Sequence, residues 1–294
     1  MFEIQYRESL QRFLLEDLGV EGDATCKHLA VGNREVAASI VAREPGVVAG
    51  LCFVEPLFKL LHPECVVTTR VEEGSEFDSG ASLLLVKGPA SAVLSGERTA
   101  LNLLSRMFGI ATQVRSLVTT LQGTMCKLLP TRKTLPGLRF FDKYAAETGG
   151  AARHRYGLND AIMIKDNHLA LGEEIESVLR RTRESAGHML VIEIECDTLS
   201  QLHKILQADQ DMMETDPRGR GVDVVLLDNM TYAQLGEAVT MVQAHPRTIL
   251  TEASGGIRPE NLRQVAATGV DFVSMGAITH SVMPVDLGLD FLER

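Results

Sequence analysis

The chain has 294 residues, about twice the length typical of one domain, so one large barrel and two domains are both compatible with it. Its 45% apolar and 23% charged residues are typical of a folded globular protein and exclude disordered, collagen-like and coiled-coil chains. The formal net charge of −10 disfavours nucleic acid and anionic membrane surfaces as partners. No apolar run approaches the roughly 20 residues of a membrane-spanning helix, and the first residues carry acids where a signal peptide has basic and apolar regions, so we expect a soluble, cytoplasmic protein.

Helical and strand patterns alternate over the first hundred or so residues. Amphipathic spacing predicts helices over residues 8–19 and 53–64, which end near a glycine and a proline. Residues 34–46 are predicted to form a strand that meets a turn, and residues 81–90, which follow a turn signal, are predicted to form another strand. A long pattern with apolar residues at helical spacing follows over 95–123. The sequence therefore predicts an α/β N-terminal domain that leads into a connecting helix.

The rest of the chain repeats a shorter pattern. Five apolar strands each end in a polar, charged or glycine residue before a helical stretch, at separations of 30, 33, 26 and 22 residues. The segment MCKLLP, residues 125–130, adds an earlier strand to the series. About six such units predict an incomplete α/β barrel, with its chemistry in the loops at the carboxyl ends of the strands. The residues that end the five strands are Lys165, Glu195, Asp228, Ser254 and Gly276.

Basic residues gather in one window of this acidic chain. Between residues 131 and 168 there are seven lysines and arginines and four acids, which gives the window a net charge of +3. Such a concentration indicates a small anionic ligand, because arginine grips carboxylates and lysine acts as a mobile point charge. For any one of these residues a solvated surface charge is the simpler interpretation, and Lys165 also fits the desolvated amine of a Schiff-base enzyme. The candidates near strand ends are Arg132, Lys133, His154, Arg155 and Lys165.

Two glycine turns follow the last two strands. Residues 254–256 lie between a strand and a helix, and Gly276 and Ala277 lie in the same position one unit later. Backbone N–H groups at a helix start bind phosphate when no side chain obstructs them, and barrels commonly place a phosphate on these loops. Glycines that merely turn the chain are the alternative. Together the two turns favour a phosphate site, and His280 fits either a contact to that phosphate or a helix cap.

Glu195 and Asp228 provide carboxylates at adjacent strand ends. Such a pair holds Mg²⁺ through one or two oxygens and water, alongside the phosphates of a substrate. Salt bridges to barrel lysines are the alternative for either acid alone. Glu193 shares a face with Glu195, since strand side chains alternate, and we expect it to be a buried structural partner. Arg98, at the start of the connecting helix, has by itself the pattern of an exposed helix arginine.

Two further features carry no predicted chemistry. The five cysteines are scattered and form no CxxC pair, so neither a disulfide framework nor a cysteine zinc site is indicated, and we expect buried thiols. The charged segment 209–220 is typical of a solvated loop extension.

Several long motifs cover nearly the whole chain. They run from about residue 13 to 281 and include LLEDLGVEGDAT, GPASAVLSGERTALNLLSRMFGIAT, TRKTLPGLRFFDKYA, GGAARHRYGLNDAIMIKDNH, IEIE, LLDNM, EASGGI and GVDFVSMGAITHS. With these motifs in this order, the chain resembles the quinolinate phosphoribosyltransferases, the decarboxylating enzymes of NAD biosynthesis. The resemblance implies transfer of the phosphoribosyl group of phosphoribosyl pyrophosphate to quinolinate with decarboxylation, giving nicotinate mononucleotide, pyrophosphate and CO₂.

The resemblance also implies an architecture and an assembly. An N-terminal open α/β sandwich is expected over residues 1–113 and an incomplete α/β barrel over 114–280, with the C-terminal tail 281–294 packing back on the first domain. The family works as a homodimer or higher homo-oligomer, in which the partner's N-terminal domain completes each site. Arg98 is thereby implied to reach into the partner's site.

By the same resemblance, the candidate residues divide between two substrates and one metal ion. The residues expected around the two carboxylates of quinolinate are Arg132, Lys133, His154, Arg155 and Lys165. The residues expected at the ribose hydroxyls of phosphoribosyl pyrophosphate and at Mg²⁺ are Glu195 and Asp228. The residues expected at the 5′-phosphate are Ser254, Gly255, Gly256, Gly276 and Ala277. The expected catalytic residues are Lys133, Lys165, Glu195 and Asp228.

Four positions depart from the family's pattern, and two other functions stay open. Many relatives contain Asp-Thr-Arg-Lys-Thr-Thr and Gly-Gly-Gly-x-Asn-His-Arg, where this chain has Pro130, Leu135, Ala151 and Arg153. None of these differences removes a charged candidate. The other functions are a barrel lyase that forms a Schiff base on Lys165, and a non-catalytic protein, or a paralogue for another heterocycle, that binds a phosphorylated ligand.

Overall fold

The chain divides into two structural units, each described here by itself. The computed structural model describes residues 3–32, 34–169, 174–215 and 221–292. The first unit combines Met1–Ser116, Thr134–Gly150 and Ile278–Arg294, and the second combines Leu117–Lys133 and Ala151–Ala277. Residues 134–150, which the sequence analysis placed with the barrel, therefore group with the N-terminal elements.

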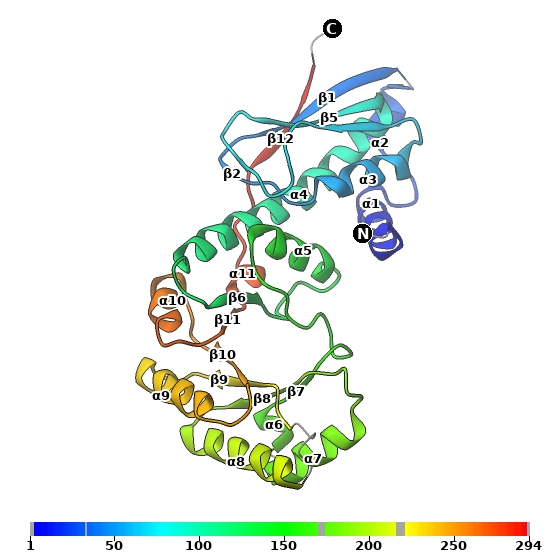
Figure 1. The fold of residues 1–294 in the computed structure, drawn as a ribbon. Helices are drawn as coiled ribbons and strands as arrows, with labels where there is room; N and C mark the ends of the chain where they lie inside the picture. The colour runs from blue at the N-terminus through cyan, green and yellow to red at the C-terminus, as the bar shows by residue number, and fades with distance from the viewer. Residues whose placement is uncertain (1–2, 33, 170–173, 216–220, 293–294) are drawn as a thin grey trace. The chain divides into compact units, whose positions relative to one another are not determined.

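An antiparallel sheet forms the first unit together with several helices (Figure 1). Its four strands follow the order β12-β1-β5-β3, and β2 and β4 form a small separate pair. The strands are β1 (Glu35–Ala42), β2 (Gly46–Val47), β3 (Val66–Thr69), β4 (Glu76–Phe77), β5 (Ser82–Pro89) and β12 (Leu287–Phe291). The helices are η1 (Glu3–Gln5), α1 (Arg7–Leu18), α2 (Ala24–His28), η2 (Leu51–Phe53), α3 (Val54–Leu61), α4 (Ala90–Thr120), α5 (Arg139–Gly149) and α11 (Ala277–His280).

Local sequence signals explain several of these boundaries. Helix α1 ends where Gly19 adopts a positive φ of +56°, a conformation that glycine allows without steric cost. The Asp23 side chain accepts a hydrogen bond from the Cys26 N–H at 2.9 Å and so caps α2. Strand β12, close to the C-terminus, pairs with β1 from Ala38 opposite Phe291 to Ala42 opposite Leu287.

Aromatic packing explains why α5 belongs with the first unit. Phe53, which is fully buried, packs edge to face on Phe141 and Tyr144 of α5, with ring centroids 5.1 and 5.2 Å apart. Such contacts between large buried rings are among the strongest apolar interactions in a protein interior. No local pattern in residues 134–150 shows which core this helix covers.

A parallel sheet of six strands forms the second unit. The strand order is β6-β11-β10-β9-β8-β7, and among the described residues the end strands β6 and β7 do not pair with each other. Helices α7 to α10 pack on one another in chain order along the sheet (Figure 1). The strands are β6 (Lys127–Pro130), β7 (Ile162–Ile164), β8 (Ile192–Cys196), β9 (Val224–Asp228), β10 (Leu250–Ser254) and β11 (Phe272–Met275). The helices are α6 (Asp166–Leu169), α7 (Ile175–Ser185), α8 (Leu199–Thr215), α9 (Tyr232–Gln243) and α10 (Pro259–Ala266). The predicted fold class, a sheet-based α/β unit followed by an incomplete parallel α/β barrel, is confirmed.

Segment 209–220 differs from the predicted solvated loop. Residues up to Thr215 continue helix α8, and residues 216–220 lie outside the described part of the chain. Asp209 is fully buried and accepts hydrogen bonds from the Gly221 and Val222 N–H groups and from the Arg247 guanidinium. A buried carboxylate needs such partners, so Asp209 ties the end of this connection to the amino end of the sheet.

The cysteines follow the prediction with one exception. All five are free thiols; four of them are buried, and Cys52 is exposed. In the part of the chain that the structure describes, no helix is both long enough and apolar enough to span a membrane.

Candidate active site

The carboxyl ends of the six parallel strands bring most of the predicted residues to one edge of the second unit. In the pairing register Ser254 lies opposite Asp228, and Glu195 lies opposite Leu226 on the same strand as Asp228. Met275 lies opposite Pro130, so the residues after β11 and β6 begin at the same level. Because all the strands are parallel, their terminal side chains and the loops behind them share this edge.

An ion pair links the carboxyl ends of β7 and β8. The ammonium of Lys165, just after β7, contacts the carboxylate of Glu195 on β8. The Glu195 side chain is only 10% exposed, whereas that of Lys165 is 41% exposed. The salt bridge to a barrel lysine that the sequence left open for Glu195 is therefore present. The half-exposed amine of Lys165 therefore lies beside the Glu195 carboxylate at this edge.

Arg132 and Arg155 form a basic pair at the same edge. Arg155 is half-buried, and its pKa is lowered first by burial and then by the positive charge of Arg132. A hydrogen bond from the Arg155 guanidinium reaches the sulfur of Met163, a weak acceptor, at 3.1 Å. Two guanidinium groups that repel each other gain most from an anion placed between them.

Two buried carboxylates lie against His154. The Nε2 atom of His154 is 3.7 Å from the Glu193 carboxylate and 3.4 Å from the Glu252 carboxylate. Both glutamates are almost fully buried. Burial and the neighbouring charge of Glu252 raise the pKa of Glu193 to about 9, so this carboxyl group keeps its proton at neutral pH. Glu193 is thus the buried partner that strand alternation predicted.

Asp197 adds a third carboxylate to the predicted pair, Glu195 and Asp228. Burial raises the pKa of Asp228, and the charge of Asp197 raises it further, while Lys165 and Lys133 lower it. Asp197 directly follows β8, so it lies at the same edge as Glu195. The sequence analysis missed Asp197 and Glu252. The signal that could have found them is their position, since each is a polar residue at or near the carboxyl end of a strand.

Both glycine turns lie between a strand and a helix, as the sequence predicts. Gly255 and Gly256 follow β10 with φ values of +82° and +62°, which side chains other than glycine rarely adopt. Gly276 follows β11 and precedes the short helix α11, so both turns lead from a strand into a helix. His280 is exposed, and its Nδ1 atom lies 2.7 Å from the Ser281 hydroxyl.

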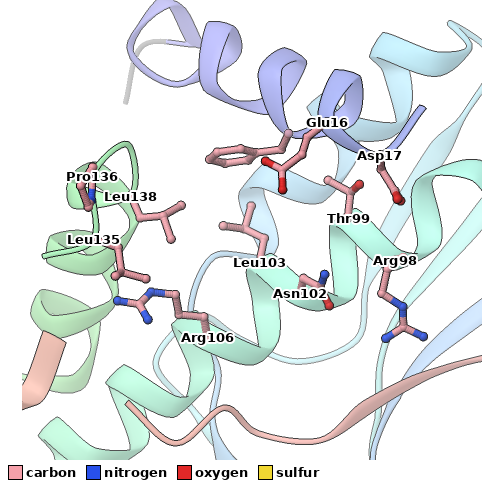
Figure 2. A pocket seen from close by; sticks show the side chains of 11 residues that line it. Glu16, Asp17, Arg98, Thr99, Asn102, Leu103, Arg106, Leu135, Pro136 and Leu138 are labelled. Atoms are coloured by element: carbon pink, nitrogen blue, oxygen red, sulfur yellow. The ribbon is translucent and has the colours of Figure 1, made fainter. Parts of the chain in front are cut away.

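Arg98 lies in the first unit, whereas the other predicted site residues belong to the second. It lines a cavity of about 550 Å³ between α1, α4 and the turn at 135–138. Figure 2 shows Arg98 and Asn102 one helical turn apart on α4, with Glu16 and Asp17 on α1. The Arg98 side chain is exposed, and its guanidinium forms no hydrogen bond or ion pair with the residues that the structure describes.

The fold and this edge fit a class of protein, the α/β-barrel proteins in which the loops at the carboxyl ends of the strands bind a phosphorylated, anionic ligand. Comparison with known families narrows the class. Residues 23–108 match the model of the quinolinate phosphoribosyl transferase N-terminal domain, and residues 110–290 match that of the C-terminal domain. The chain belongs to the quinolinate phosphoribosyltransferase family.

Individual relatives agree with this assignment. The chain is 40% identical over 288 residues to the nicotinate-nucleotide pyrophosphorylase [carboxylating] of Mycobacterium leprae, covering 97% of this chain and 96% of that protein. It is 38% identical over 290 residues to a probable enzyme of the same name from Bacillus subtilis, covering 99% of this chain and 94% of that protein. The solved nicotinate-nucleotide pyrophosphorylase of Ehrlichia chaffeensis is 34% identical, with a TM-score of 0.88 over 99% of this chain and 100% of that one. The prediction of a phosphoribosyltransferase of this family is confirmed.

Proposed function

We propose that the edge built from Lys165, Glu195, Asp228 and the neighbouring loops transfers a phosphoribosyl group from phosphoribosyl pyrophosphate to quinolinate. The products are nicotinate mononucleotide, pyrophosphate and CO₂, the reaction that membership of the family assigns. The observation that carries the assignment of this site is the half-buried pair of Arg132 and Arg155, because two adjacent guanidinium groups fit the two adjacent carboxylates of quinolinate.

Quinolinate is held by the basic side of the site in this proposal. Each guanidinium of the pair grips one carboxylate with two parallel hydrogen bonds. The imidazole of His154 contacts the pyridine ring or a carboxylate, and its orientation is supported by Glu193 and Glu252, within 3.7 Å of Nε2. This arrangement fixes the ring so that its nitrogen points to the sugar, which lowers the entropic cost of the reaction.

Phosphoribosyl pyrophosphate occupies the glycine-turn side. Its 5′-phosphate accepts hydrogen bonds from the backbone of the two turns, where glycine leaves the N–H groups unobstructed. Glu195 and Asp228 face the ribose hydroxyls, and the lysines meet the pyrophosphate. The residues assigned to the 5′-phosphate are Ser254, Gly255, Gly256, Gly276 and Ala277.

The proposed reaction includes Mg²⁺, because the carboxylates at this edge are suitable ligands for the ion. Asp228 lies near the like-charged Asp197, which raises the Asp228 pKa, and a divalent cation relieves such a repulsion. Carboxylate oxygens are the ligands that Mg²⁺ prefers, with substrate phosphates completing the shell. Glu195 and Asp228 would hold the ion directly or through water, and its chemistry there is to neutralise charge on the pyrophosphate.

Two bond changes make up the reaction. The pyridine nitrogen attacks C1′ as the bond from C1′ to the pyrophosphate oxygen breaks, and Lys133 and Lys165 offset the charge that leaves. The ring nitrogen is then cationic. When the adjacent carboxylate leaves as CO₂, its electron pair remains on the ring carbon, stabilised by that cation, and the carbon then takes up a proton. No protein nucleophile is required.

Each site is completed by a second copy of the chain in this proposal. Arg98 supports the idea because it is exposed in a 550 Å³ cavity and its guanidinium has no partner among the described residues. A charged side chain presented in this way fits an anion held on another subunit. A cytoplasmic location is also proposed, since the five cysteines are free thiols.

One incubation tests the proposed reaction. The purified chain is mixed with quinolinate, phosphoribosyl pyrophosphate and Mg²⁺, and nicotinate mononucleotide and CO₂ are measured. Formation of neither product excludes the proposal. A parallel borohydride treatment tests the Schiff-base alternative. We expect no adduct on Lys165, because its amine is engaged by the Glu195 carboxylate.

A further inference from the structure

Asn229 has an unusual backbone conformation at the edge of the site. It follows the last residue of β9 and has a φ of +53°. Among the described residues, Ala30 is the other non-glycine position with a positive φ. Asparagine tolerates this left-handed region better than most residues, although glycine adopts it more easily. A side chain at this position is therefore expected to make contacts that offset the strain of the backbone.

Hydrogen bonds connect Asn229 to both sides of the sugar-phosphate site. Its Nδ2 atom donates to the Asp228 carboxylate at 2.6 Å. Its backbone N–H donates to the Ser254 carbonyl at 3.0 Å, one step beyond the pairing of Asp228 with Ser254. One residue thus contacts both the carboxylate at the end of β9 and the last residue of β10.

The amide also lies directly against the glycine turn. A Cβ atom built on Gly255 would lie 2.3 Å from the Asn229 Oδ1 atom and 2.8 Å from its backbone nitrogen. Real Cβ atoms do not approach other atoms so closely, so the turn can follow this path beside Asn229 only with a glycine at 255. The Asp228 carboxylate, the Asn229 amide and the Gly255 backbone therefore form one packed row.

We propose that Asn229 is a positioning residue that holds the Asp228 carboxylate and the turn at Gly255 at a fixed separation. The furanose ring and its short 5′ arm limit how far the ribose hydroxyls and the 5′-phosphate of a sugar phosphate can lie from each other, so this spacing sets the affinity for phosphoribosyl pyrophosphate and leaves that for quinolinate unchanged. The inference rests on the proposed roles of Asp228 and of the turn. Groups that orient ligand-binding carboxylates typically contribute 10- to 100-fold in affinity or activity.

Two substitutions separate the amide from the backbone conformation. Asn229→Gly keeps the left-handed conformation but removes the amide. Asn229→Asp keeps the size of the side chain but replaces the donor with a second carboxylate beside Asp228. As a matched control, Gln207→Glu makes the same kind of change at an exposed amide that donates to Asp211 at 2.8 Å on helix α8.

Binding of ribose 5-phosphate, measured by calorimetry in the presence of Mg²⁺, tests the inference independently of enzyme activity. We expect the Kd to rise about 10-fold in Asn229→Gly and up to about 100-fold in Asn229→Asp, with parallel rises in the KM for phosphoribosyl pyrophosphate. The KM for quinolinate and the Tm are expected to change little, and Gln207→Glu is expected to match the wild-type chain.

Two results overturn the inference. If Asn229→Gly binds ribose 5-phosphate like the wild-type chain, the backbone conformation alone matters. If the KM values for both substrates rise together, Asn229 supports the fold of the whole site and does not act on the sugar phosphate alone. Failure of the proposed function is distinct, because it appears in the wild-type chain as the absence of product and of ribose 5-phosphate binding, and it overturns both proposals.

Discussion

Glu193 and Glu252 belong to different strands, β8 and β10, yet their carboxyl groups lie 3.7 and 3.4 Å from the same atom, Nε2 of His154. Burial and the charge of Glu252 raise the pKa of Glu193 to about 9, compared with an ordinary glutamate value of 4.5. The unfolded chain therefore releases this proton at a lower pH than the folded chain does. Between about pH 4.5 and pH 9 the folded state binds the extra proton, so its stability falls as the pH rises.

Glu193→Gln is expected to remove this pH dependence. The amide has nearly the same shape but does not ionise, so the variant should lose less stability than the wild-type chain as the pH rises from 5 to 9. Each pH unit in this window changes the stability by about 1 kcal/mol per extra proton held by the folded state. Denaturant unfolding at a series of pH values measures the difference. The exposed Glu237→Gln is the control, and parallel curves for wild type and Glu193→Gln would contradict the prediction.

Arg155→Lys is expected to weaken quinolinate binding. Lysine keeps the positive charge but loses the planar pair of donors that grips a carboxylate. We expect the KM for quinolinate to rise at least about 10-fold, with a smaller change in the KM for phosphoribosyl pyrophosphate. Steady-state kinetics with each substrate varied in turn measure both values. Arg153→Lys, at an exposed arginine two residues earlier, should leave both unchanged. A rise in the KM for phosphoribosyl pyrophosphate alone would contradict the assignment of Arg155 to quinolinate.

Residues that end strands could be predicted from the sequence because two local patterns coincide there. An apolar run marks the strand, and the first polar residue after it marks the carboxyl edge, so Lys165, Glu195 and Asp228 could be placed without a structure. The glycine turn after β10 could be found in the same way, because the positive φ values of Gly255 and Gly256 favour glycine.

Contacts between strands could not be predicted in this way. Glu252 lies within an apolar strand, and its role depends on the facing Glu193 and on His154, which comes from a loop about a hundred residues earlier in the chain. Asp209 looked solvated because its neighbours in sequence are charged, yet it is buried by its contact with Arg247. Only tertiary packing decides such partners, since no local pattern records them.

The buried ion pair of Arg106 and Asp142 predicts a large effect on stability. Two hydrogen bonds join the side chains at 2.7 and 2.9 Å, and the Asp142 side chain is fully buried. Arg106→Met leaves that carboxylate without its cation, which should cost about 3 kcal/mol of the free energy of unfolding at pH 8. The loss should shrink as the pH falls toward 4, because burial already raises the pKa of Asp142 and protonation removes the stranded charge.

Denaturant unfolding at pH 8 and pH 5 measures this effect. The matched control is Arg43→Met, which breaks the exposed pair with Asp290, whose side chains are 43% and 49% exposed. Exposed pairs are screened by water and salt, so this control should change stability little. Equal losses for the two variants, or a loss in Arg106→Met that does not depend on pH, would contradict the role given to the buried pair.

Subunit mixing tests whether Arg98 completes the site of a second copy. Arg98→Ala and Lys133→Ala are each expected to be inactive, because one lacks the cation supplied by the partner and the other lacks the cation of its own barrel. In a mixed dimer, one site combines the intact Lys133 of one chain with the intact Arg98 of the other, while the second site carries both changes. With free exchange at equal amounts, half of the dimers are mixed and half of their sites are intact, so about a quarter of the wild-type activity should return. Subunit exchange is verified with differently tagged chains. No recovery in the presence of exchange would mean that each chain uses its own Arg98, and recovery without any dimer would exclude the shared site altogether.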